Sequence, residues 1–288
     1  RAFPGGRDDL VRLIAFAITR DDLDGVVNAT TPHPVRQSEL ADALDSQADH
    51  QAAALAVRKL RFLEKLDQEI GDAIAPDHLG TISSGSAVVD WKNTSGLGKD
   101  GKPPLVLIYT AAGKPTAPCL ASSTDGRHFT KFSGNPVLRQ ITGGNRDPKI
   151  MWHEPTKKWV MVLYVGLPEK KHTIHFFTSP NLRDWTLASI AEGGLDKDHF
   201  LFECPDFFEL PVDGKASNSK WVLSAANSAY ALGTFDGAKF TPEQIKLPGH
   251  RGKGFYAAQT FSDIPAKDGR RIQIGWFQTP TPGMPFSL

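Results

Sequence analysis

The sequence has 288 residues, of which 40% are hydrophobic and 23% charged, and its formal net charge is +1 at pH 7. These values are typical of a globular protein with a substantial core. A net charge this small gives no support for a nucleic-acid or anionic-membrane partner. No apolar run approaches the roughly 20 residues that span a bilayer. The first ten residues, RAFPGGRDDL, lack the apolar stretch of a signal peptide.

The sequence shows no spacing typical of a metal site or a disulfide framework. Its two cysteines, Cys119 and Cys204, could form one bridge at most, and its nine histidines are scattered. We therefore expect neither a metal ion nor a cofactor.

Residues 1–75 have the spacing of amphipathic helices. Apolar side chains recur in three- and four-residue steps over 8–19 and 49–75, and a serine in N-cap position opens 38–46. The prolines of 29–37 indicate a loop. The sequence predicts a helical N-terminal segment over 1–75.

From residue 76 to residue 288 the helical spacing disappears. Short apolar runs alternate with Gly, Pro, Asp and Asn turns, which is typical of β-strands of about five to seven residues. The predicted strands lie at 84–91, 103–110, 147–152, 159–165, 172–179, 205–210, 220–227 and 270–277.

The predicted strands repeat along the chain. Residues in the second strand of each apolar hairpin follow one another at steps of 55, 61 and 51: Leu107, Val162, Leu223 and Ile274. Aromatic residues that follow a turn recur at steps of 56 and 55: Phe129, Trp185 and Phe240. A period near 55 with about four strands per unit indicates propeller blades. The predicted fold is mostly β, a partial propeller of about four blades after an α-helical segment.

The repeat brings polar residues together. Steps of 56 from Asp147 lead to Glu203 and Gln259, and one step back leads to position 91. Because the first strand of each propeller blade lines the central axis, these positions are expected to converge on one funnel.

Two facing carboxylates are suited to glycoside cleavage. Arg146 beside Asp147 favours an ionised carboxylate, whereas the apolar neighbours of Glu203 favour a protonated acid. Glu203 would then be the acid/base and Asp147 the permanent anion. A structural ion pair at Arg146–Asp147 and a strand-edge charge at Glu203 explain the same pattern equally well.

Four stretches resemble the family 32 glycoside hydrolases, which include invertases, levanases and inulinases. They are SGSAVVD, NRDPKIMWHE, FECPDFFELP and FYAAQTFSDIPAKDGRRIQIGWFQ, the last followed by PGMPF. The resemblance covers about residues 77–288. It implies a five-bladed propeller that hydrolyses terminal or internal β-fructofuranosidic bonds in sucrose or fructans with retention of configuration.

The resemblance also implies roles for single residues. The Arg-Asp-Pro aspartate, here Asp147, holds fructosyl hydroxyls and stabilises the transition state, and the Glu-Cys glutamate, Glu203, is the acid/base. Substrate contacts are expected from residues in or next to the matching motifs: Ser84, Arg146, Tyr256, Gln259 and Trp276. The residue before Ser84 departs from the family phenylalanine, because it is Ser83.

The family nucleophile, an aspartate in a Trp-x-Asn-Asp-Pro-Asn-Gly motif on the first blade, has no counterpart in this sequence. We therefore expect a propeller domain over 76–288 that is incomplete at both ends, with its nucleophile unknown. Carboxylates of the helical segment are candidates to replace it: Asp8, Asp9, Asp21 and Asp22. An open propeller edge would be covered by a helix, by an oligomeric partner or by a second chain.

The N-terminal segment has two short resemblances of its own. Residues 7–45 resemble the C-terminal part of an epimerase-like short-chain dehydrogenase, without the Gly-rich cofactor motif. Residues 52–71 resemble the last helix of a J-domain iron–sulfur co-chaperone.

Three functions are consistent with the sequence. The first is a β-fructofuranosidase-type hydrolase acting on a small carbohydrate or a fructan. The second is a fructan-binding propeller that lacks the nucleophile, and the third is an interaction module whose activity lies in residues 1–75. Family membership would make secretion or a periplasmic location plausible.

Overall fold

The computed structural model describes residues 76–168, 171–192, 201–227, 229–250, 254–262, 264 and 270–277. All of them lie in one compact unit, Ile74–Ser287. The helices predicted over 1–75, the two short resemblances there and the four candidate aspartates lie outside the described residues.

The described residues form three four-stranded antiparallel sheets and one two-stranded sheet. The first sheet contains β1 (Thr81–Val89), β2 (Leu105–Ala112), β3 (Ala117–Ser123) and β4 (Thr130–Lys131). The second contains β5 (Gly144–His153), β6 (Lys158–Leu167), β7 (Lys171–Ser179) and β8 (Thr186–Glu192). The third contains β9 (Asp206–Val212), β10 (Lys215–Ser224), β11 (Tyr230–Phe235) and β12 (Phe240–Leu247). The fourth contains β13 (Phe255–Thr260) and β14 (Gln273–Phe277).

Each four-stranded sheet is an up-and-down meander in chain order, which is the architecture of a propeller blade. The predicted mostly-β partial propeller is confirmed. The repeat series also fall where the prediction put them. Leu107, Val162, Leu223 and Ile274 lie in the second strands of their sheets. The turn-following aromatics begin or directly precede the fourth strands.

All eight predicted strand runs overlap observed strands, whereas most of the outer strands were not predicted as separate elements. β3 has the sequence APCLASS and β12 the sequence FTPEQIKL. Small residues in the first and exposed polar residues in the second replace the branched aliphatic alternation on which the prediction depended.

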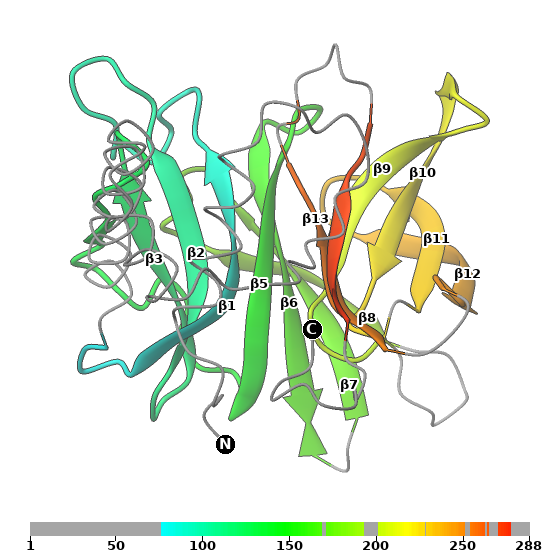
Figure 1. The fold of residues 1–288 in the computed structure, drawn as a ribbon, viewed down its shortest axis with the longest axis horizontal. Coiled ribbons are helices and arrows are strands. Elements are labelled where there is room, and N and C mark those ends of the chain that lie inside the picture. The colour runs from blue at the N-terminus through cyan, green and yellow to red at the C-terminus, as the bar shows by residue number, and fades with distance from the viewer. Residues whose placement is uncertain are drawn as a thin grey trace, which may run out of the picture. The chain divides into compact units, whose positions relative to one another are not determined.

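The first strands β1 and β5 lie side by side, and so do β9 and β13 (Figure 1). Side-chain contacts join all four of these strands. Ser86 on β1 accepts a 3.0 Å hydrogen bond from the Ile150 amide of β5 and donates a 2.9 Å bond to the Pro148 carbonyl. These contacts fix the register of β1 against β5.

A buried ion pair links the next three inner strands. The Lys149 ammonium on β5 lies 2.9 Å from an Asp206 carboxylate oxygen on β9 and donates a 2.8 Å bond to the Thr260 carbonyl on β13. The Thr260 amide donates a 2.6 Å bond to the other Asp206 oxygen. Because each polar atom has a partner, the charges are tolerated in the interior.

The cores lie between neighbouring sheets. Alternate side chains of β7 point in opposite directions, so that Phe176 packs 5.1 Å from the Phe207 ring of β9 while Phe177 joins the core against the first sheet. A third cluster, containing Tyr109, Cys119 and Ala121, lies on the other face of the first sheet. The first sheet is therefore apolar on both faces.

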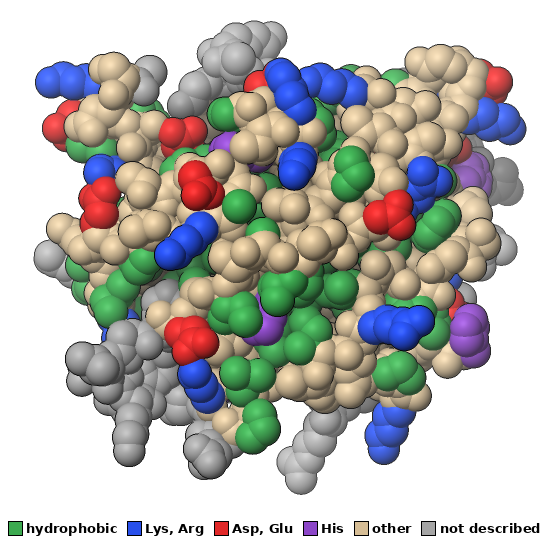
Figure 2. All heavy atoms as spheres, turned by 180° about the vertical axis from the view of Figure 1, so that it is seen from behind, with side chains coloured by type: hydrophobic (Ala, Val, Ile, Leu, Met, Phe, Trp, Pro, Cys, Tyr) green, Lys and Arg blue, Asp and Glu red, His purple; other side chains and the backbone are tan. Residues whose placement is uncertain are grey.

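Charged side chains of both signs are interspersed on the face drawn in Figure 2. In the described part of the chain, no helix is both long enough and apolar enough to cross a membrane. The same residues contain no cluster of His, Cys, Asp and Glu that could hold a metal ion.

Candidate active site

Irregularities in the pairing of the inner strands set the direction in which the candidate side chains point. The pairing of β1 shifts between Ile82 and Gly85, that of β5 between Arg146 and Lys149, and that of β13 between Tyr256 and Gln259. Left-handed backbone accompanies them, with φ of 62° at Asp147, 42° at Glu203, 43° at Cys204 and 50° at Ala257. Such bulges and strained residues are frequent next to active sites because they re-aim side chains.

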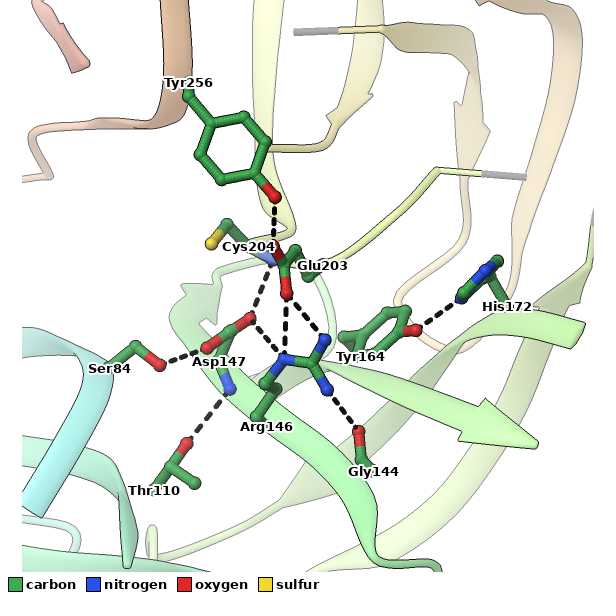
Figure 3. A network of polar contacts seen from close by, with 10 residues as sticks. All are labelled: Ser84, Thr110, Gly144, Arg146, Asp147, Tyr164, His172, Glu203, Cys204 and Tyr256. Atoms are coloured by element: carbon green, nitrogen blue, oxygen red, sulfur yellow. Dashed lines mark hydrogen bonds and ion pairs between the residues drawn. The ribbon is translucent and has the colours of Figure 1, made fainter. Parts of the chain in front are cut away.

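Asp147 is the buried anion of the site, with 3% of its surface exposed. One carboxylate oxygen accepts a hydrogen bond from the Ser84 hydroxyl, and the other accepts a 2.9 Å bond from the Cys204 amide. The Asp147 amide donates a 3.0 Å bond to the Thr110 hydroxyl. Partners from the first sheet and from the segment that leads into β9 thus fix Asp147 (Figure 3).

Glu203 lies in the segment that leads into β9, opposite Asp147. One carboxylate oxygen accepts bonds from two nitrogens of Arg146, at 3.0 Å from Nε and 2.6 Å from Nη2. The other accepts a hydrogen bond from the Tyr256 hydroxyl of β13. Since 18% of the Glu203 side chain is exposed, this carboxyl can be approached by a ligand.

Arg146 makes the expected ion pair with its chain neighbour Asp147 and, in addition, a shorter ion pair with Glu203 that the sequence did not predict. The guanidinium lies 3.7 Å from Asp147 but makes its two short bonds to Glu203. Arg146 is the last paired residue before the irregularity of β5 and Asp147 lies inside it, and the arginine reaches Glu203 in the segment that leads into β9. The cation therefore links both carboxylates and does not single out Asp147.

An aromatic platform holds the arginine in place. Its guanidinium lies 4.5 Å from the Tyr164 ring centre and 5.8 Å from that of Phe202, and Nη1 donates a 3.1 Å bond to the Gly144 carbonyl. The Tyr164 hydroxyl in turn contacts Nδ1 of His172. Burial opposes the charge on Arg146, but its bond and attraction to Glu203, with Asp147, outweigh this and raise its pKa.

Two further groups are held in their protonated forms. Burial, reinforced by the negative charges of Asp147 and Glu203, raises the pKa of the Cys204 thiol. The site therefore does not hold a thiolate nucleophile. Burial and the bond to Glu203 likewise raise the pKa of Tyr256, so its phenol donates to Glu203 at neutral pH.

The step of 56 residues was wrong in two places. Ala257, two residues before Gln259, has the left-handed backbone that corresponds to Asp147 and Cys204. Trp91 lies beyond the end of β1, and Ser84 is the β1 residue that meets Asp147. The steps between equivalent positions are unequal because each sheet has its own loop lengths.

The predicted residues Ser84, Arg146, Asp147, Glu203 and Tyr256 converge on one network. Trp276 on β14 contacts this network through Tyr256, with the two ring centres 6.3 Å apart. Gln259 pairs with Ile274 past the irregularity, and no hydrogen bond among the described residues joins it to either carboxylate.

The sequence did not point to several side chains of this network, among them Thr110, Tyr164 and His172. Thr110 and Tyr164 stand inside apolar strands, where their spacing is that of core residues.

Comparisons with known proteins agree with this geometry. The family model "Glycosyl hydrolases family 32 N-terminal domain" matches residues 67–284. A levanase of Bacillus subtilis (strain 168) is 44% identical over 222 residues, which are 71% of this chain and 32% of the levanase. An extracellular exo-inulinase of Meyerozyma guilliermondii is 38% identical over 227 residues, which are 73% of this chain and 43% of the inulinase.

Solved structures show the same fold. A fructofuranosidase from Schwanniomyces occidentalis, complexed with fructose, is 34% identical with a TM-score of 0.62, covering 72% of this chain and 42% of that one. An exo-inulinase from Aspergillus awamori is 29% identical with a TM-score of 0.61, covering 72% and 48%. The chain spans less than half the length of these relatives. Because the family model matches most of its residues, the chain belongs to glycosyl hydrolase family 32, in the part that corresponds to the N-terminal domain.

Proposed function

We propose that this protein hydrolyses β-fructofuranosidic bonds in sucrose or fructans, with a small carbohydrate or a fructan as its ligand. The observation that supports this most strongly is the Asp147–Arg146–Glu203 network, held at the irregularities of inner strands in a family 32 domain. The relatives named levanase, exo-inulinase and fructofuranosidase all act on or bind such sugars by their names and titles.

The contacts suggest a division of labour between the carboxylates. Glu203 is the more exposed of the two, and it is the group that gives a proton to the leaving glycosidic oxygen and later takes one from water. Asp147, whose oxygens are held by the Ser84 hydroxyl and the Cys204 amide, binds fructosyl hydroxyls. Its buried negative charge stabilises the positive charge that develops on the sugar ring.

Retention of configuration also needs a nucleophilic carboxylate, which forms a bond to the anomeric carbon before water breaks it. In the part of the chain that the structure describes, the network holds two carboxylates, and neither is assigned this role. The nucleophile stays unassigned.

The test is fructose release from sucrose, inulin and levan by the protein and its Glu203→Gln variant. Removal of a general acid/base lowers kcat by about 100- to 10,000-fold, and we expect a loss in this range. The matched control is Glu243→Gln, the same chemical change at an exposed glutamate on β12 that pairs with Lys220. This control should keep full activity.

Equal rates for the protein and the Glu203→Gln variant would contradict the assigned role. No fructose release from either protein, together with binding of fructan, would instead identify a binding protein without hydrolase activity.

A further inference from the structure

A cavity of about 800 Å³ opens at the ends of the inner strands away from Asp147 and Glu203. Its wall is formed by the last residues of β1 and β5, by the first half of β9, and by Ser262 and Arg271 next to β13 and β14. On β5, Trp152 of the cavity wall is five residues beyond Asp147, which is about 17 Å at a rise of about 3.3 Å per residue. Lys149, two residues beyond Asp147, is the lining residue of β5 that comes nearest to the site in sequence, and neither Asp147, Arg146 nor Glu203 lines the cavity. The cavity is therefore separate from the candidate active site.

Two tryptophans provide an aromatic surface in this cavity. Trp91, just after β1, exposes 69% of its surface, the largest value among the exposed hydrophobic side chains of the described residues. Trp152 contacts the Glu154 carboxylate through its indole nitrogen, and the Lys92 ammonium lies 4.8 Å from its ring centre. Leaving a ring as large as Trp91 in water costs hydrophobic free energy that packing against a ligand would recover.

Polar groups of both signs surround the tryptophans. Lys92 donates a 3.1 Å bond to Glu154, which joins the loop after β1 to the turn after β5. Across the cavity, the Arg271 guanidinium lies 4.6 Å from the Phe208 ring centre and donates a 3.0 Å bond to the Thr260 hydroxyl. Glu209 adds a second carboxylate to the lining. Such a balanced set of donors and acceptors fits a neutral ligand with many hydroxyls better than an ion.

We propose that this cavity is a second carbohydrate site, which takes a further stretch of a fructan chain, with Trp91 as the stacking surface and Lys92 and Glu154 as hydroxyl partners. The choice of fructan rests on the proposed function, because a fructan is the neutral polyhydroxylated polymer that such a hydrolase meets. Two sites on one domain raise the affinity for a polymer through effective concentration, whereas a disaccharide gains nothing from the second site.

The test compares Trp91→Ala with Ile245→Ala, a matched control that truncates another exposed hydrophobic side chain on the outer strand β12. Binding is measured in the Glu203→Gln background as retardation in native gels that contain levan. We expect Trp91→Ala to bind levan about fivefold more weakly, the size of a lost aromatic contact, and Ile245→Ala to bind as before. With Glu203 present, sucrose hydrolysis by Trp91→Ala should be unchanged.

A second variant keeps the test independent of folding. Glu154→Gln changes a side chain that is 60% exposed, removes the charge paired with Lys92, and should also weaken levan binding. Unchanged levan retardation in both variants would overturn the second site.

The two proposals fail separately. Normal fructose release with unchanged levan binding in the variants would refute only the second site. Loss of levan binding in Trp91→Ala, with no fructose release from the unmodified protein, would refute only the hydrolase.

Discussion

Arg146 is the residue that connects the two carboxylates. Its guanidinium is bonded to Glu203 and lies within 3.7 Å of Asp147, and the ring of Tyr164 covers its face. A cation over an aromatic ring gains about 0.5–2 kcal/mol, depending on how much water is excluded. The ring of Tyr164 therefore positions the arginine, although no hydrogen bond among the described residues joins Tyr164 to either carboxylate.

Replacing Tyr164 by Leu should lower kcat/KM for sucrose about tenfold, because the arginine loses the aromatic face that orients it. Tyr164→Phe keeps the ring and removes only the hydroxyl contact with His172, so it should stay within about twofold of the unmodified protein. Steady-state kinetics on folded protein measures both. An equal loss in the two variants would show that the hydroxyl, and not the ring face, positions the arginine.

Single residues also show where prediction from sequence succeeds. Asp147 and Glu203 were found because they stand one repeat of 56 residues apart and in the Arg-Asp-Pro and Glu-Cys motifs, and Ser84 and Tyr256 follow from the family motifs. The second partner of Arg146, Glu203, could not be predicted from neighbours in the chain, because it lies 57 residues further along the sequence. Thr110 and Tyr164 look like ordinary core residues of β2 and β6, and only the fold shows their contacts.

Strand β7 contains a histidine, His175, that is buried among apolar side chains. His175 is 5% exposed, its ring stacks 6.2 Å from that of Phe177, and neither ring nitrogen has a partner among the described residues. Burial lowers its pKa, and the charge of Glu192 opposes this without outweighing it. Burial lowers the pKa of His153 on β5 as well.

A lowered pKa in the folded state makes stability depend on pH in one direction. The unfolded chain binds a proton at His175 near pH 6.5, whereas the folded protein resists protonation until lower pH. The free energy of unfolding should therefore fall as the pH decreases below about 6.5. We expect His175→Leu to weaken this dependence, as measured by urea unfolding midpoints at neutral and mildly acidic pH.

His78→Leu is the matched control, because His78 is exposed. It should leave the pH dependence of the unfolding midpoint as it is in the unmodified protein. The same slope in His175→Leu would contradict the role given to burial of His175.

How well a strand could be predicted depended on how deeply it is buried. Strands such as β6, buried along most of its length between two cores, have long apolar runs that are recognisable from sequence. The outer strands β8 and β12 are mostly exposed and have weaker patterns. Their existence followed from the count of strands per repeat and not from their own residues.

The whole domain brings the site together from all four sheets. Ser84 comes from β1, Asp147 from β5, Glu203 from the entry to β9 and Tyr256 from β13. The repeat predicted this convergence. It misplaced Gln259 by two residues, because a fixed period does not account for the strand irregularities.

The first sheet has an apolar face at the edge of the domain, where the repeat predicts an incomplete propeller. Tyr109, Cys119 and Ala121 form an apolar cluster on the face turned away from β5. A sheet that is apolar on both faces is packed on both. Our expectation that a helix, an oligomeric partner or a second chain covers this edge stays a prediction.

The central claim is that Asp147 and Glu203 form one fructosyl-binding active site, and a crystal structure of the Glu203→Gln variant with sucrose tests it most directly. The account predicts fructosyl hydroxyls within about 2.5–3.2 Å of the Asp147 carboxylate, and the glycosidic oxygen next to the side chain at position 203. Sucrose bound away from both positions, or none bound there at saturating concentration, would contradict it.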